Sequence, residues 1–138
     1  MRRTSEERPG RPEQVLERLV GDLERWGALF LEIARSRGHP AAERVLGGLA
    51  EWLGNDLLDG WLHLPIPVFE RLSDRSEQLF QACREYQERL RRAPGGLPED
   101  DRRPSEAAIA SALDRIRELG VRPGGRKPSG EPGRQPPG

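Results

Sequence analysis

Apolar residues recur along two long segments of this sequence at alternating intervals of three and four residues, the spacing of one face of an α-helix. The first segment covers residues 12–37, and its stripe is Leu16, Leu19, Leu23, Trp26, Phe30 and Ile33. The second covers residues 67–92, and its stripe is Phe69, Leu72, Ser76, Leu79, Cys83, Tyr86 and Leu90. The shared period and length predict two long helices that pack together as in a helical bundle or a coiled coil.

The segment between these helices, residues 40–62, is also apolar but contains four glycines. A glycine inside a helix costs up to about 1 kcal/mol relative to alanine. We therefore expect a helix from 40 to about 53, a turn near Gly54 and Asn55, and a short helical piece after it. Two prolines in residues 63–68 lack backbone donors and favour extended neighbours, so this stretch is expected to be a short connection that is not helical throughout.

Proline and glycine also interrupt the C-terminal part of the chain. Residues 93–104 are predicted to be a linker, followed by a shorter helix over residues 105–120 with Ser105 as its N-cap. The basic residues 1–11 are predicted to be flexible, and residues 121–138, which have almost no apolar content, to be disordered.

The predicted fold class is therefore all-α. Three main helices in a helical domain over residues 12–92, plus the shorter fourth helix, would form a small helical bundle or a long helical hairpin with disordered termini. Hydrophobic residues make up only 34% of the chain, so the core of such a bundle is expected to be thin.

The distribution of charge argues against nucleic acid as the main partner. The chain has 23 basic and 23 acidic residues, but its two ends are basic and the predicted helical part is mildly acidic. A duplex-binding domain normally carries a basic face in its structured part. The alternative that stays open is a small protein that binds nucleic acid or an anionic surface through its basic termini. The residues that would do so are Arg2, Arg3, Arg8, Arg11, Arg122, Arg126, Lys127 and Arg134.

The compartment is predicted from cysteine usage and from apolar runs. The only cysteine cannot form an internal disulfide, and the first residues lack the apolar stretch of a secretory signal. The longest apolar runs are too short to span a bilayer and contain acidic residues. These features predict a cytoplasmic protein that is not transmembrane.

Candidate chemistry is sparse. Cys83 would need a neighbouring cation to become a nucleophile, and the only histidines, His39 and His63, fall at element boundaries. Helical spacing instead places Cys83 between Leu79 and Tyr86, as a small core residue. No pair of possible ligands has the local spacing of a metal site, and no glycine-rich phosphate loop follows a strand. We therefore expect no catalytic residues, no metal and no cofactor, and a protein that is not an enzyme. A small enzyme that uses Cys83 or a histidine is a further alternative, and a folded Cys83→Ala variant with full activity would exclude its cysteine version.

The segment 52–68 holds two of the three tryptophans and a dense set of leucines. It can be ordinary core. However, a few thin helices offer little room to bury so much, so we expect part of it to contact a protein partner or a second copy of the chain. The residues expected to bind that partner are Trp52, Leu57, Trp61, Leu64, Ile66, Phe69, Leu79 and Tyr86.

The stretch "SEQLFQACREYQERL", with a Leu-Pro pair before its helix, resembles the accessory E subunit of class III polyhydroxyalkanoate synthases. The matching positions are Leu64, Pro65, Gln78, Leu79, Glu85, Tyr86, Gln87 and Leu90, and the tryptophan-rich segment before them is similar in character. The resemblance covers only about residues 64–92, and this chain is much shorter than typical members. It implies a non-catalytic helical subunit that binds and activates a synthase whose catalytic residues lie on another chain.

Overall fold

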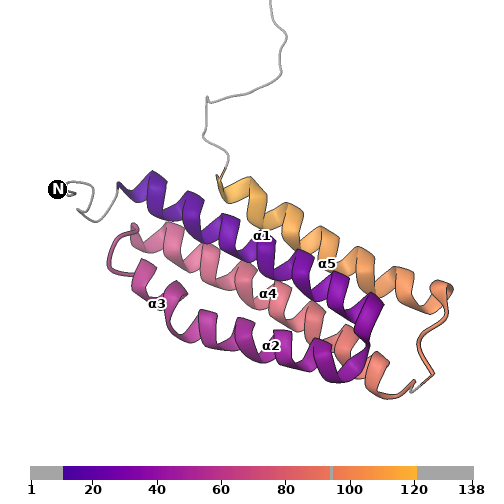
Figure 1. The fold of residues 1–138 in the computed structure, drawn as a ribbon. Helices are drawn as coiled ribbons and strands as arrows, with labels where there is room; N and C mark the ends of the chain where they lie inside the picture. Colours follow the sequence, from indigo (N-terminus) through magenta and orange to yellow (C-terminus); the bar gives the residue numbers. More distant parts are fainter. Residues whose placement is uncertain (1–10, 94, 121–138) are drawn as a thin grey trace, which may run out of the picture.

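The computed structural model describes residues 11–93 and 95–120, and nearly all of them are helical. Four long helices run side by side, and a short one lies at one end of them (Figure 1). No strand occurs within the described ranges. The all-α prediction is confirmed, in the form of a small helical bundle. The helices are α1 (Pro12–Arg37), α2 (His39–Gly54), α3 (Asp56–Gly60), α4 (Ile66–Arg91) and α5 (Glu99–Gly120).

The long helices alternate in direction, so that each one packs against two antiparallel neighbours. The order around the bundle is α1, α2, α4, α5, and α1 and α4 meet across its diagonal (Figure 1). Ion pairs between α1 and α5 follow this antiparallel register, since Arg35 pairs with Glu106 at 2.9 Å and Glu24 pairs with Arg117 at 3.2 Å. This is the up-down-up-down topology that short connections favour.

Helix boundaries in the first two-thirds of the chain follow the turn residues. Pro12 starts α1, where a missing backbone N–H costs nothing. Gly38 ends it with a positive φ of 82°, and its N–H donates to the carbonyl of Ile33. The chain then breaks at Asn55 and turns again over residues 61–65 before α4 begins at Ile66. Both breaks lie where the sequence predicts them.

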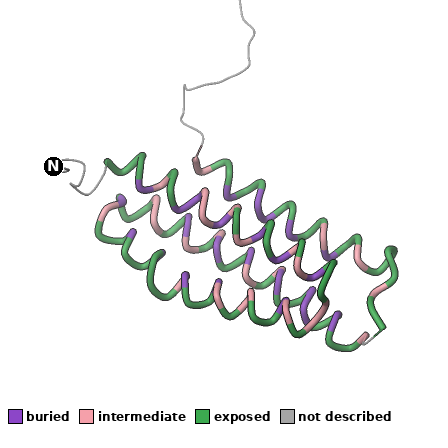
Figure 2. Tube along the Cα trace, in the orientation of Figure 1, coloured by how far each residue is buried: buried purple, intermediate pink, exposed green. Residues whose placement is uncertain are grey.

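The core runs along the axis of the bundle, as the buried positions in Figure 2 show. On α4, every position of the predicted stripe from Leu72 to Leu90 is buried. On α1, only half of the predicted stripe is buried, and Trp26 is among those that are partly exposed. The buried face of α1 also includes Val20 and Gly27, because this helix is covered from two sides, by α2 and by α5.

The predicted linker at 93–104 is wrong from residue 99 onward, and so is the assignment of Ser105 as an N-cap. Helix α5 begins at Glu99, so that it has 22 residues and forms a full fourth wall of the bundle. Three acidic residues in its first turn complement the positive end of the helix, and Glu99 pairs with Arg103 at 3.1 Å one turn later. Pro104 lies inside the helix without ending it, and Ser105 is buried in the helix interior. The ranges 1–10 and 121–138, on which flexibility and disorder were predicted, lie outside the described residues.

The contact between α1 and α5 depends on a glycine. A β-carbon at Gly27 would lie 2.8 Å from Cδ2 and 3.2 Å from Cγ of Leu113, a buried residue of α5. Any larger residue at position 27 therefore displaces the whole leucine side chain. Gly47 on α2 is a contrasting case, because it is exposed and no atom lies within 4 Å of a β-carbon placed there.

We predict opposite effects of alanine at these two helical glycines. Gly47→Ala should raise the free energy of unfolding by up to about 1 kcal/mol, the difference in helix propensity. Gly27→Ala gains the same propensity but overpacks the core at a cost of about 1–3 kcal/mol, so its free energy of unfolding should fall. Urea unfolding followed by circular dichroism measures both. Equal stabilisation by the two variants would show that α1 and α5 do not approach this closely.

Candidate functional site

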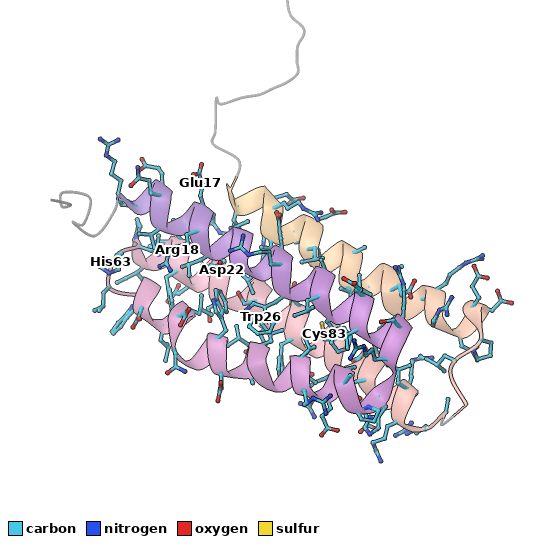
Figure 3. The ribbon with its side chains drawn as sticks, viewed as in Figure 1. Glu17, Arg18, Asp22, Trp26, His63 and Cys83 are labelled. Carbon is cyan, nitrogen blue, oxygen red and sulfur yellow. The ribbon has the colours of Figure 1, made fainter. Side chains whose placement is uncertain are left out.

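Cys83 lies in the core of the bundle. Its side chain is fully buried in α4, and burial raises the pKa of the thiol to about 12. Figure 3 places His63 at the end of the bundle near the start of α4, away from Cys83. His39 accepts a hydrogen bond at Nδ1 from Gln87 Nε2 at 2.8 Å. Among the described residues, no group of three or more His, Cys, Asp and Glu could hold a metal ion.

We predict that the native thiol is unreactive. Burial lifts the pKa from 9.0 to about 12, which lowers the thiolate fraction near neutral pH by roughly a thousandfold. Reaction with a disulfide reagent at pH 8 should therefore be very slow in buffer and fast in denaturant. A native rate equal to the denatured rate would contradict this placement of Cys83.

A polar cluster ties three helices together at the end of the bundle opposite α3. The Tyr86 hydroxyl on α4 donates to Glu106 on α5 at 3.2 Å, and Arg35 on α1 donates to both oxygens of that carboxylate at 2.9 and 3.1 Å. The ring of Phe30 packs edge-on against Tyr86, with centroids 5.9 Å apart. Helices α1, α4 and α5 each contribute a side chain to this network.

The electrostatics of this cluster suit a structural contact between helices more than an acid or base catalyst. The hydrogen bond from Arg35 is the main cause that lowers the pKa of Glu106, which keeps the carboxylate ionised. Burial, assisted by the negative charge of Glu106, raises the pKa of Tyr86 to about 12. Neither group is poised to exchange a proton near pH 7.

We predict that Glu106 makes the bundle acid-sensitive. Its pKa in the folded protein lies below the ordinary value of 4.5, so its contribution to stability is full above that pH and is lost as the pH falls through the folded pKa. Glu106→Gln should therefore flatten the loss of unfolding free energy between about pH 5 and pH 3. Glu77→Gln, at an exposed residue of α4, is the matched control for the loss of one carboxylate. Identical slopes for wild type and Glu106→Gln would contradict the assignment.

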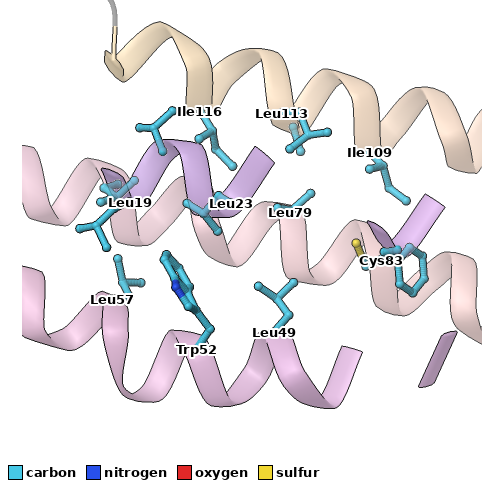
Figure 4. Close-up of a cluster of buried hydrophobic side chains, with 14 of the residues drawn as sticks. Leu19, Leu23, Leu49, Trp52, Leu57, Leu79, Cys83, Ile109, Leu113 and Ile116 are labelled. Carbon is cyan, nitrogen blue, oxygen red and sulfur yellow. The ribbon is translucent and has the colours of Figure 1, made fainter. Parts of the chain in front are cut away.

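The residues predicted to bind a partner do not form one surface. Five of them are buried in the core and cannot contact a partner of the folded bundle: Trp52, Leu57, Leu64, Leu79 and Tyr86. Phe69 is partly buried, whereas Trp61 and Ile66 are 58% and 59% exposed. The expectation was wrong for the buried five because each of them faces another helix of the same chain. Trp52 and Leu57 lie on α2 and α3, which pack against α1, whereas Leu79 and Tyr86 lie on α4, which α5 covers. Figure 4 shows Leu49, Trp52 and Leu57 pointing into this core.

The structure adds Leu58 and Leu62, 55% and 75% exposed, to Trp61 and Ile66. We call these four residues, all within 58–66, the apolar patch. They lie on α3, on its connection to α4 and at the first residue of α4, at one end of the bundle (Figure 1). The prediction missed both leucines because Leu57 and Leu58 look equivalent in sequence, and only the packing of α3 turns one inward and the other outward.

The surroundings of the apolar patch are acidic. None of the 23 Lys and Arg residues of the chain falls within residues 45–70, which contain Glu51, Asp56, Asp59 and Glu70. All four of these carboxylate side chains belong to exposed residues. The segment that carries the patch is thus apolar and acidic and contains no lysine or arginine.

A pocket of about 310 Å³ opens on the other side of α3, between α1 and α2. It combines aromatic with charged walls, whereas the pockets along α4 and α5 have no aromatic lining residue. Sequence reasoning missed it, because its residues come from three helices and face one another only when α1 pairs with α2. Its lining residues are Asp22, Arg25, Trp26, Leu29, Trp52 and Asp56.

Comparisons with known proteins do not assign this site to a family. No family model, no curated protein and no solved structure matches the chain. Among the residues that the structure describes, no helix combines the length and the apolar content that crossing a membrane requires.

Proposed function

We propose that this protein is a non-catalytic helical interaction subunit, which binds a partner protein through the apolar patch. The observation that supports this most directly is the exposure of Leu58, Trp61, Leu62 and Ile66 in one short segment. Single exposed leucines are common on soluble proteins, but a cluster that includes a tryptophan is typical of binding surfaces. The interior in turn offers no reactive group, since Cys83 is buried and Glu106 is held ionised.

The charge around the apolar patch favours a protein over a nucleic acid as the partner. Phosphates need cations, and the segment 45–70 supplies only carboxylates. The basic termini that define the alternative lie outside the described residues, apart from Arg11, so binding of nucleic acid or an anionic surface through them stays a prediction. That alternative requires salt-sensitive binding that disappears when both ends are deleted.

The resemblance to the accessory subunit of polyhydroxyalkanoate synthases suggests one candidate partner, a synthase catalytic subunit in the cytoplasm. Most positions of the resemblance hold the bundle together: Leu64, Leu79, Tyr86, Gln87 and Leu90 are buried. Only Pro65, Gln78 and Glu85 are exposed. The resemblance therefore concerns the helix core, and contact with a synthase would rest on the apolar patch.

We predict that a Trp61→Ser/Leu62→Ser double variant loses the partner but keeps the fold. Both side chains are mostly exposed, so the free energy of unfolding should change by no more than about 0.5 kcal/mol per residue. Loss of a tryptophan at the centre of an interface costs about 2 kcal/mol or more, which is roughly a thirtyfold weaker affinity. Ala110→Ser, at an exposed residue of α5 outside both the patch and the pocket between α1 and α2, is the control.

The experiment has three readouts. Sedimentation over a range of concentrations tests binding of a second copy of the chain. Affinity capture from the native host tests binding of other proteins. Co-purification with a class III synthase catalytic subunit, followed by an assay of polymer synthesis, tests the named candidate. A partner bound by wild type and Ala110→Ser but lost by the double variant supports the proposal. Equal binding by all three proteins would overturn the role of the patch. Patch-dependent capture of another protein, with no binding to the synthase, would overturn only the synthase as partner.

A further inference from the structure

The pocket between α1 and α2 has two indole rings in its walls. Trp52 is buried, and it extends from α2 toward α1 (Figure 4). Trp26 is partly exposed and lies against α2 at Gly48, where a β-carbon would come within 2.7 Å of its ring. The glycine thus lets the ring of Trp26 lie directly on the backbone of α2. The faces of such rings attract cations.

The pocket also presents two carboxylates. Asp22 is held in place, because the indole N–H of Trp52 donates to its Oδ2 at 3.2 Å, and its side chain is only 18% exposed. Asp56 is exposed in the first turn of α3 and reaches the pocket from the other side. A hydrogen-bonded carboxylate beside aromatic walls is a favourable setting for a guanidinium group, which can bond with its edge and stack with its face.

A guanidinium of the chain itself already binds there. Arg25 lines the pocket and its Nη2 donates to Asp22 Oδ1. The Arg25 side chain is 75% exposed, however, so it lies on the solvent side of the pocket. An exposed pair one helical turn apart contributes little free energy and can be displaced.

We propose that this pocket is a binding site for a guanidinium group, either of an arginine side chain on another protein or of a small guanidino compound. The incoming cation would enter between Trp26 and Trp52, take over the carboxylate of Asp22 from Arg25, and gain Asp56 as a second anionic contact. The volume of about 310 Å³ suits one such group with its alkyl stem. The site is distinct from the apolar patch and does not depend on the function proposed for that surface.

The three tryptophans make the test direct, because each gives one indole N–H signal in a ¹H–¹⁵N spectrum of the full chain. The probe is Nα-acetyl-arginine amide, and the matched ligand control is Nα-acetyl-citrulline amide, which has nearly the same shape without the charge. We expect the arginine probe to shift the signals of Trp26 and Trp52 in a saturable way and to leave Trp61 unchanged. The citrulline probe should shift none of them.

Variants of the chain test the individual contacts. Arg25→Gln removes the internal competitor and should tighten binding about threefold, the ratio expected for a surface ion pair. Arg44→Gln, at an exposed arginine elsewhere, controls for the loss of one positive charge and should bind about as tightly as wild type. Asp56→Asn should weaken binding by a similar factor, whereas Asp59→Asn, on the same short helix but outside the lining of the pocket, should weaken it less.

Any one of three results would overturn the proposal. These are equal binding of the arginine and citrulline probes, shifts at Trp61 instead of Trp26 and Trp52, or weaker binding after Arg25→Gln. Butylguanidinium, which lacks the amide groups of the capped arginine, distinguishes the two sources. Tighter binding of the capped arginine indicates a side chain of a protein, and tighter or equal binding of butylguanidinium indicates a small compound; no binding of either excludes the site.

Discussion

The stripe on α4 is buried because α5 lies along its length. Helix α4 packs against α2 on one side and α5 on the other, with α1 across the diagonal. Ile109, Leu113 and Ile116 of α5 complete the core along its axis (Figure 4). Full burial of one such side chain contributes about 1.5–3 kcal/mol, so the bundle depends on this fourth wall more than on any polar contact. The cluster around Glu106 then fixes the register of α5 against α1 and α4.

Helix boundaries were predictable where a local rule acts alone. Gly38 and Pro65 end or start helices through their own backbone constraints, and the break at Asn55 follows a run of glycines. The start of α5 was not predicted, because Pro98 and Pro104 made residues 93–104 look like a linker by composition. The order of charges held the missing signal: acidic residues come first and arginines follow, as at the start of a helix, with Glu99 four residues before Arg103.

The surface features could be predicted only in part. Trp52 and Trp61 belong to one apolar segment and look alike in sequence, yet Trp52 lies between α1 and α2 with a hydrogen bond to Asp22, and Trp61 is exposed beyond α3. Their different roles depend on where the chain turns after Gly54. The pocket could not be predicted from the sequence for a similar reason, because Trp26 approaches α2 only where that helix has a glycine, at position 48.

The helix pairs of the bundle also differ in how far apart they lie in the sequence, and this difference predicts the order in which they form. A single residue, Gly38, separates α1 from α2, so their pairing is local and closes early. The pairing of α1 with α5 joins Arg35 to Glu106 across 71 positions of sequence. During synthesis from the N-terminus, a chain that has reached the end of α4 therefore still lacks the helix that covers its stripe. Until residues 99–120 emerge, the nascent bundle has an open apolar side, and this side, more than the finished surface, is where a chaperone would bind.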